Sequence, residues 1–221
     1  MSLRIPGMTL MQEDDALILR SESRLRTLAS AVVGGGWGQA RTILVRHVSK
    51  HYDHPDPAAD LQAFARSRGI QNPFVGLMTA AYLDRGARVV ELAEGDLALT
   101  LVMTAGFSNA TAAGLSPPAG PEHLPAPGTI NLILIIDAPL TPAAMVNAVI
   151  TVTEAKTAMI QAWGMQAPGG HPATGTSTDA VVIACRPEGE PLPYAGPVTR
   201  VGHLIARAVR LGMESARPES N

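Results

Sequence analysis

The sequence has little cysteine and little charge, and each shortage excludes a class of protein. Cys185 is the only cysteine among 221 residues, so no disulfide forms within the chain, which favours a reducing compartment. Charged residues make up 16%, the net charge is −2, and no lysine- or arginine-rich run offers a nucleic-acid surface. The longest apolar run, INLILII, is far shorter than the ~20 residues of a membrane helix. We therefore expect a cytoplasmic protein that binds neither nucleic acid nor membranes.

Aromatic residues are also scarce, at 4%, whereas apolar residues reach 46%. The core must therefore be aliphatic, as in strands packed against helices. Alternating apolar residues and β-branching predict eight strands, at 16–21, 24–33, 41–48, 74–82, 87–94, 96–105, 129–137 and 179–185. Turns at 84–86 and 94–96 predict an antiparallel meander over 74–105. Capping residues followed by proline predict helices at 56–69 and 141–164, and a third helix covers 195–215.

These elements predict one α+β domain over residues 1–221. We expect a largely antiparallel or mixed sheet of about eight strands, packed by about three helices, with an α/β/β/α layering as one arrangement. Residues 1–15 and 214–221 are expected to be peripheral tails. The high apolar content makes a homodimer plausible.

The segment HPATGTSTDAVVIAC, residues 171–185, places a hydroxyl-rich stretch directly before a strand. Thr174, Gly175, Thr176, Thr178 and Asp179 exceed what one turn needs. The stretch is not a phosphate loop, because it lacks a glycine-lysine ending and leads into a strand. Two interpretations stay open: a turn whose side chains satisfy their own backbone, or a reactive site.

The helix predicted at 141–164 is apolar except in its middle. At ~100° per residue, Lys156, Thr153, Thr157 and Glu154 fan across one side in that order. A buried Glu or Lys costs several kcal/mol unless it is paired. The pattern indicates either a structural ion pair or a polar site in which burial tunes proton transfer.

Two further strand ends carry polar residues of interest. In TAGFSNATAAG, Thr104 ends a strand and Ser108 and Asn109 follow a glycine. In PGTINL, Thr129 opens a strand and Asn131 interrupts an apolar run. Such residues are ordinary in turns, but asparagine side chains also hold substrate amides and stabilise oxyanions.

Glycines and histidines supply weaker candidates. The run at 34–36 either lets the backbone approach a ligand, through Gly35 and Gly36, or forms a hairpin tip. Met78 is a candidate wall for a wide cleft. The histidines at 47, 51 and 54 suggest a metal site by number, but their spacing on a predicted strand does not match a metal motif.

Taken in order, seven segments resemble the adenosylcobinamide amidohydrolase family of corrinoid salvage. They are LASAVVGGG (28–36), VGLMTAA (75–81), VMTAGFSNATAAG (102–114), GTINLILIID (128–137), ITVTEAKTAMI (150–160), ATGTSTDAVVIAC (173–185) and YAGPVTRVGHLI (194–205). The resemblance implies hydrolysis of the amide that joins the corrin carboxylate to its aminopropanol arm, which turns adenosylcobinamide into adenosylcobyric acid. It implies a corrinoid substrate that brings its own cobalt, and we expect no separate cofactor and no protein-bound metal.

The residues suggest how such a reaction could run. In our hypothesis Glu154 or Asp179 activates a water or the Thr176 hydroxyl, and Lys156 keeps the carboxylate ionised or donates to the leaving amine. Asn109, Asn131 and loop backbone groups bind the oxyanion, and Thr104, Thr153 and Thr178 orient their neighbours. The predicted substrate-binding set is Thr104, Ser108, Asn109, Thr129, Asn131, Thr153, Thr174, Gly175, Thr178, Gly35, Gly36 and Met78.

Two other functions fit the same sequence. One is a corrinoid-binding or transport-accessory protein without hydrolysis. The other is a metal-dependent amidase that uses His47, His51 and His54.

Overall fold

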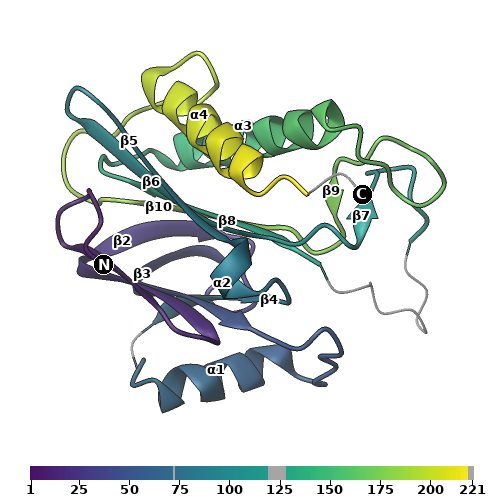
Figure 1. The fold of residues 1–221 in the computed structure, drawn as a ribbon. Coiled ribbons are helices and arrows are strands. Elements are labelled where there is room, and N and C mark those ends of the chain that lie inside the picture. Colours follow the sequence, from purple (N-terminus) through teal and green to yellow (C-terminus); the bar gives the residue numbers. More distant parts are fainter. Residues whose placement is uncertain (72, 119–127, 219–221) are drawn as a thin grey trace.

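A computed structural model describes residues 1–71, 73–118 and 128–218, without the side chains of residues 85 and 86 (Figure 1). The strands are β1 (Met8–Gln12), β2 (Ala16–Ala29), β3 (Gly36–His47), β4 (Phe74–Thr79), β5 (Ala87–Glu94), β6 (Leu97–Ala105), β7 (Ala110–Thr111), β8 (Ile130–Ile136), β9 (Gly175–Thr176) and β10 (Ala180–Cys185). The helices are α1 (Pro57–Ser67), α2 (Leu83–Gly86), α3 (Pro142–Ala162) and α4 (Arg200–Ser215). The predicted α+β class is confirmed.

Eight strands form one mixed sheet in the order β4-β3-β2-β10-β8-β6-β5, with β1 also paired to β2. The long strand β2 has two halves. Its first half pairs with β1, from Leu17 to Ser21, and its second half pairs with β10, from Arg26 to Ala29. The register to β3 shifts between Arg20 and Leu25, where the sheet bends. One sheet therefore supplies two layers.

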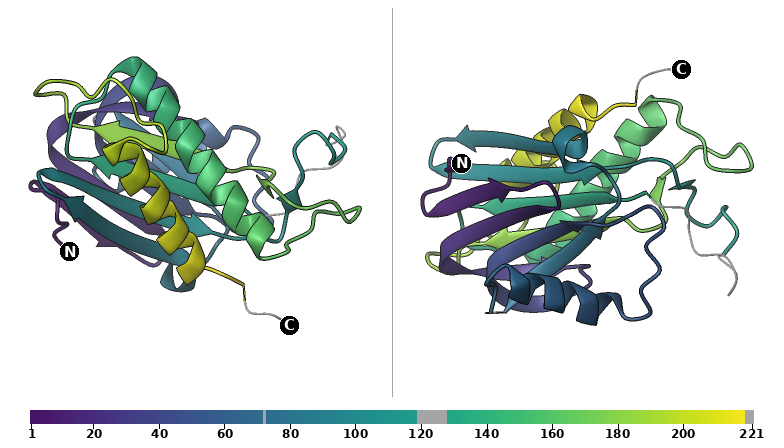
Figure 2. Two further views of the ribbon diagram at one scale, coloured as in Figure 1. Left: turned by 90° about the horizontal axis from the view of Figure 1, so that it is seen from above. Right: turned by 60° about the horizontal axis from the view of Figure 1, so that its bottom comes forward.

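The two layers face each other across an aliphatic core, and helices cover the outer faces (Figures 1 and 2). Leu17, Ile43 and Leu77 of one layer pack with Ile133 and Val182 of the other. Helix α1 covers the outside of the first layer, and α3 and α4 cover the second. The α/β/β/α layering follows from the bend in β2.

Helix starts agree with their capping residues. Asp56 and Thr141 accept hydrogen bonds from Ala59 N and Ala144 N, and each is followed by proline. The third helix begins at Arg200, later than predicted, because Thr199 caps it through Gly202 N. Within the described residues, no helix combines the length and apolarity needed to cross a membrane.

The first fifteen residues are not the peripheral tail that we predicted. Strand β1 pairs with β2, and Leu3, Ile5, Met8 and Leu10 are buried in the core between the layers. The prediction failed because this short segment carries few β-branched residues, so its apolar alternation was not recognised. At the other end, α4 extends to Ser215, and residues 219–221 lie outside the described part.

The predicted meander over 74–105 is only partly correct. Strands β5 and β6 form an antiparallel hairpin around Gly95, whose φ is +61°. Strand β4, however, is parallel to β3, and residues 83–86 form the one-turn helix α2 rather than a tight turn. The predicted strands at 16–21 and 24–33 are the two halves of β2.

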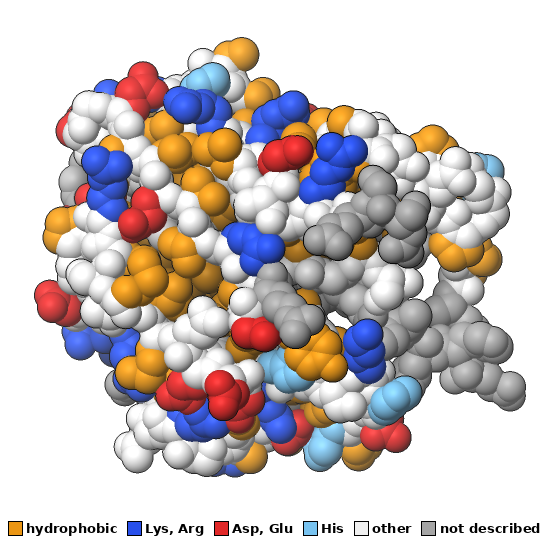
Figure 3. Space-filling view, in the orientation of Figure 1, with side chains coloured by type: hydrophobic (Ala, Val, Ile, Leu, Met, Phe, Trp, Pro, Cys, Tyr) orange, Lys and Arg blue, Asp and Glu red, His pale blue; other side chains and the backbone are white. Residues whose placement is uncertain are grey.

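Acidic and basic side chains are interspersed over the face in Figure 3.

Candidate active site

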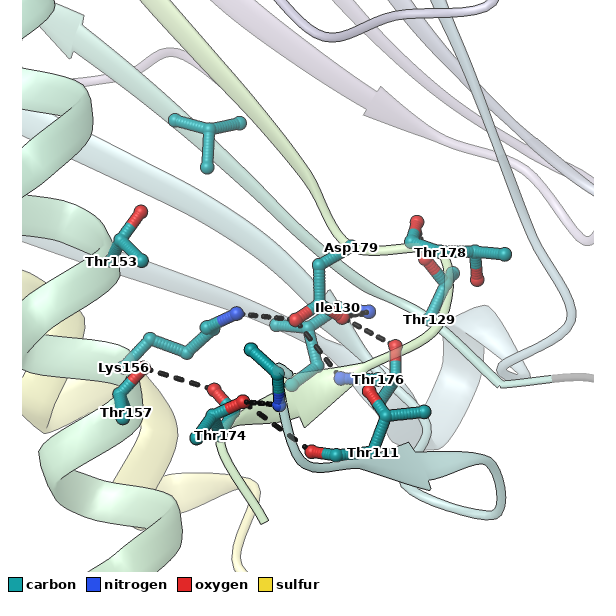
Figure 4. A network of polar contacts seen from close by, with 12 residues as sticks. Thr111, Thr129, Ile130, Thr153, Lys156, Thr157, Thr174, Thr176, Thr178 and Asp179 are labelled. Atoms are coloured by element: carbon teal, nitrogen blue, oxygen red, sulfur yellow. Dashed lines mark hydrogen bonds and ion pairs between the residues drawn. The ribbon is translucent and has the colours of Figure 1, made fainter. Parts of the chain in front are cut away.

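Asp179 lies directly before β10, and its carboxylate is the centre of a polar network (Figure 4). Oδ1 accepts hydrogen bonds from the Thr176 hydroxyl and from Ile130 N, at 3.1 Å for the latter. Oδ2 accepts from Lys156 Nζ and, at 3.1 Å, from Thr176 N. A carboxylate offers about four lone-pair positions. Asp179 therefore has all of them occupied.

Lys156 comes to this carboxylate from α3, where it is buried except for 8% of its surface. The close approach depends on Gly175 in β9. A Cβ built on Gly175 would lie 2.5 Å from Asp179 Oδ2 and 2.7 Å from Lys156 Nζ. Only glycine leaves room for the ion pair at this position. Lys156, Gly175, Thr176 and Asp179 are thus brought together, as the sequence predicted.

A two-stranded ladder positions Thr176. Strands β7 and β9 pair Ala110 with Thr176 and Thr111 with Gly175. Thr174, before β9, donates its N–H to Thr111 O at 2.8 Å, and its hydroxyl accepts from Ala113 N at 3.0 Å. Thr157, the neighbour of Lys156, donates to Thr174 O at 2.9 Å. Helix α3 is therefore tied to the ladder next to the ion pair.

Two more threonines tie β8 to β10 at this end. Thr129 Oγ1 donates to Thr178 O, and Thr178 Oγ1 donates to Gly128 O, both at 2.7 Å. These reciprocal bonds hold the residues before Ile130 and Asp179 side by side. Both threonines were predicted for the site, and they position its backbone rather than offering free hydroxyl protons.

Asn109 does not suit the predicted role of oxyanion donor. Its Nδ2 donates to Gly128 O at 2.6 Å and to Ser177 Oγ at 2.7 Å, which uses both N–H bonds. The carbonyl of Gly128 can only accept, so it fixes the orientation of the amide. Oδ1 is buried and has no hydrogen-bond partner among the described residues. What Asn109 retains is an acceptor.

Asn131 and Thr104 lie deeper, between the sheet layers. They are opposite each other in β8 and β6, and each is 1% exposed. Asn131 Nδ2 donates to Met78 O at 3.0 Å, whereas Thr104 Oγ1 is unpartnered within the described structure. The Met78 side chain packs with the core beneath α1, so only its carbonyl turns toward Asn131.

Other predicted residues lie apart from the Asp179 network. Glu154 is exposed and makes no hydrogen bond or ion pair to any described residue. Thr153 is also exposed and donates to Val149 O in its own helix at 2.9 Å. The 100° helical step carries these two side chains away from Asp179, so Glu154 is not placed to act as the base.

The remaining predicted residues lie on nearby loops. Ser108 is exposed, next to Asn109. Gly35 precedes β3 and Gly36 is its first residue. Both are exposed, and Gly36 has a φ of +79° that glycine adopts readily. Ser30, at the end of β2, exchanges hydrogen bonds of 3.0 Å with Val181, so this loop borders the same end of the sheet.

The histidines do not gather into the metal site considered as an alternative. His47 stacks on Tyr82 with ring centroids 5.4 Å apart, and His54 stacks on Tyr52 at 6.4 Å. Across residues 1–71, 73–118 and 128–218, no three His, Cys, Asp or Glu side chains could share a metal ion. The strand end at His47 and the loop that follows separate the three rings.

A surface hollow adjoins the network. Its lining is mainly apolar with a few polar groups: Phe107, Ser108, Ala110, Met165, Gln166, Ala167, Pro168 and Pro218. Phe107 meets Trp163 edge to face, with centroids 5.7 Å apart. Ala110 lies directly opposite Thr176 in the ladder, about 5 Å from it across the strands. A broad, partly apolar ligand in this hollow would therefore contact Ala110, the ladder partner of Thr176.

Sequence reasoning missed the backbone donors and the ladder. Ile130 N and Thr176 N bind Asp179, but main-chain groups leave no signature in residue types. Strands β7 and β9 have two residues each, too few for a periodic pattern. Ser177 was a signal available in TGTSTD, since its hydroxyl accepts from Asn109.

Comparison with known proteins identifies the family. The model of a family described as adenosylcobinamide amidohydrolase matches residues 4–220. A protein named adenosylcobinamide amidohydrolase from Methanosarcina mazei is 30% identical over 92% of this chain and 94% of its own length. A protein of the same name from Halobacterium salinarum is 39% identical over 55% of this chain and 54% of its own length.

Among solved structures, a Pyrococcus horikoshii protein aligns over 95% of this chain and 82% of its own, with a TM-score of 0.47 and 13% identity. The family model and the Methanosarcina relative both span nearly the whole chain. The chain belongs to the adenosylcobinamide amidohydrolase family.

Proposed function

We propose that this protein hydrolyses the amide of the aminopropanol arm of adenosylcobinamide, with Thr176 as nucleophile, Asp179 as base and Lys156 as the stabilising cation. The family and the names of the curated relatives support the reaction and its substrate. The observation that supports the residue roles is the single carboxylate that holds both the Thr176 hydroxyl and the Lys156 ammonium.

The hydrogen bonds of Asp179 favour Thr176 over water as the group that loses a proton. A water could bind Asp179 only by displacing one of its four present donors. The Thr176 hydroxyl already donates to Oδ1, and such contact between a nucleophile and its base is the usual sign of an activated hydroxyl. Serine and threonine hydroxyls need such a base, because they are weak nucleophiles when protonated.

Lys156 has donors to spare. Its ammonium carries three N–H bonds, and among the described residues only Asp179 accepts one. The spare N–H bonds suit the negative charge that develops on the amide oxygen, and we assign them the oxyanion role in place of the asparagines. Burial strengthens this effect, because little water competes for the ammonium.

The proposed hydrolysis has two stages, formation and hydrolysis of an ester on Thr176. Thr176 Oγ1 bonds to the amide carbon while its proton passes to Asp179, and Lys156 stabilises the tetrahedral oxyanion. The C–N bond breaks, and the leaving amine takes the proton from Asp179. Aminopropanol departs, and the corrin carboxyl group remains as an ester on Thr176. A water then enters, gives its proton to Asp179 and attacks the ester. The acid departs and Thr176 regains its hydrogen.

The adjoining hollow supports the choice of substrate. A corrin is a broad ring with apolar edges and several carboxamide arms. The hollow offers Phe107 and Met165 as apolar surface and Gln166 as an amide partner. A ring bound there would present an edge amide toward β9. Asn109 lies between the lining residues Ser108 and Ala110, and its Oδ1, which has no partner among the described residues, suits an N–H of the leaving arm.

The direct test follows product formation from adenosylcobinamide by chromatography for wild type and for K156M, T176A and D179N. Each variant should lose on the order of a hundred-fold or more in kcat. Thermal unfolding and circular dichroism check the fold of each variant. The exposed Glu154 supplies a control, because E154Q should keep wild-type turnover.

Three results would contradict the proposal. Wild-type turnover in a folded D179N protein would remove Asp179 from the chemistry. Corrinoid binding by the wild type without released aminopropanol would favour the accessory-protein alternative. A rate abolished by chelator and restored by a divalent metal would revive the metal-dependent amidase.

A further inference from the structure

An exposed pair of aromatic rings lies at the same end of the sheet as Asp179. Tyr82, after β4, is 61% exposed, and its ring stacks on His47 of β3 with centroids 5.4 Å apart and planes 28° from parallel. An exposed tyrosine in a soluble protein normally needs no explanation. A tyrosine already held by a second ring is different, because much of its side-chain freedom is lost before any ligand arrives.

A series of short contacts connects this pair with the site. A Cβ built on Gly106 would lie 3.6 Å from Ala81 Cβ and 3.8 Å from Gly128 Cα. Gly106 N donates to Thr129 O at 2.9 Å, and Thr129 binds Thr178, next to Asp179. Asn131 also reaches Met78 O near the end of β4. The end of β4 and the start of β10 thus border one region.

We propose that Tyr82, held in place by His47, stacks on the adenine of the adenosyl group of the substrate. This inference rests on the proposed function, since it names a further subsite of that reaction. Adenine is the candidate because it is the one aromatic ring of adenosylcobinamide, which lacks a lower nucleotide. The corrin faces are less suitable, because they carry the axial ligands and a rim of methyl and amide groups.

Stacking of a base on a protein ring contributes enough to measure. Alanine substitution at such platforms weakens binding by about ten-fold, within a broad range. The phenol oxygen is not needed for stacking, so Y82F should behave like wild type. His47 acts as a positioning residue, and H47A should produce a smaller loss than Y82A with the same substrate dependence.

The experiment compares two corrinoids, adenosylcobinamide and cobinamide with cyanide in place of the adenosyl group. Dissociation constants come from spectral titration and kcat/KM from product chromatography, for wild type, Y82A, Y82F and H47A. Y194A, which removes a similarly exposed tyrosine elsewhere, is the control. We expect Y82A to weaken adenosylcobinamide about ten-fold and to leave the cyanide form within two-fold.

Any other pattern of losses in the titrations overturns the inference. Equal losses for both corrinoids would place Tyr82 against the corrin, and no loss for either would remove it from the subsite. The titrations do not depend on turnover. A wild type that binds the adenosyl form through Tyr82 but releases no aminopropanol would contradict the proposed function while supporting this subsite. Failure to bind either corrinoid would contradict both.

Discussion

Two carboxylates in this protein, Asp179 and Asp60, each join a basic side chain to a hydroxyl group. Asp60 of α1 binds Arg46 and Tyr52, with both distances 2.7 Å. Asp179 binds Lys156 and Thr176. Each group is half-buried or buried, and each ties a helix or loop to a strand. Residue types alone would assign both of them the same role.

Their surroundings differ. At Asp60, Arg46 and Tyr52 both donate to Oδ2, and Arg46 also lies 4.6 Å above the Phe64 ring. Burial and the bond to Asp60 raise the pKa of Tyr52 to about 12, and the bonds from Arg46 and Tyr52 lower the pKa of Asp60. Tyr52 therefore stays protonated near neutral pH, and the three side chains hold α1 against β3. The Asp60 group is a structural clamp.

At Asp179 the donors divide between the two oxygens, and two are main-chain N–H groups from different strands. A glycine clears the space for the lysine, and a hollow opens beside the threonine's ladder. A cation, a carboxylate and a hydroxyl therefore do not make a reactive site by themselves. Strand ends, a glycine and an adjacent hollow distinguish the reactive candidate from the clamp.

The largest effect should come from neutralising Asp179, and the same change at Asp60 serves as its comparison. D179N should reduce turnover about a thousand-fold, because the base for Thr176 is lost. D60N should keep turnover within two-fold and lower the free energy of unfolding by about 1 kcal/mol, since its ion pair is partly exposed. Steady-state kinetics and urea denaturation measure both. Similar kinetic losses in the two variants would end the distinction.

The next largest effect should come from Gly175, the glycine that distinguishes the Asp179 group from the Asp60 group. G175A places a methyl group within 2.7 Å of Lys156 Nζ, so the ion pair must shift and turnover should fall about a hundred-fold. G196A is the matched control, because a Cβ there meets nothing within 4 Å. Kinetics and thermal unfolding check both. An unimpaired G175A enzyme would show that the close approach is not needed.

A smaller effect concerns the bond between α3 and the ladder. T157V keeps the shape of the side chain but removes the 2.9 Å hydrogen bond to Thr174 O. We expect a loss of about 1 kcal/mol in unfolding free energy and a several-fold drop in kcat. T153V, whose hydroxyl bonds only within its own helix, should change neither quantity appreciably. Equal behaviour of the two variants would show that the tie does not position Lys156.

The smallest effect at neutral pH is the titration of Tyr52. Its pKa of about 12 exceeds the ordinary value of 10.0, so folding favours the protonated phenol. This stabilisation is complete below pH 10 and is lost as pH rises toward 12. Subtracting the ultraviolet titration of Y52F from that of wild type should show one phenol that ionises near pH 12. Ionisation near pH 10 would contradict the clamp.

Much of the fold follows from sequence periodicity. The strands at 41–48, 87–94 and 129–137 and the helices at 56–69 and 141–164 were found within a few residues, because caps and apolar patterns are local. The parallel pairing of β4 was not found, since pairing depends on how the bend in β2 brings distant strands together. Burial of β1 depends on the same bend.

In the site, too, the features with a local sequence signal were predicted, and those that depend on tertiary contacts were not. Lys156, Thr176 and Asp179 were predicted because polar residues in an apolar helix and before an apolar strand are unusual, and they do meet. Glu154 was included because the four polar residues of α3 span about 160° of the helical wheel. The sequence does not show which part of that arc faces the start of β10. Asn109 was assigned as a donor because its type allows it, and only the structure shows both N–H bonds engaged.

The most direct test of the central claim is intact-mass spectrometry of enzyme quenched in acid during turnover of adenosylcobinamide, followed by peptide mapping. The account predicts a corrinoid ester on the peptide that contains Thr176, absent from T176A. An enzyme that turns over with no adduct, together with a T176A variant that hydrolyses the substrate at the wild-type rate, would contradict it.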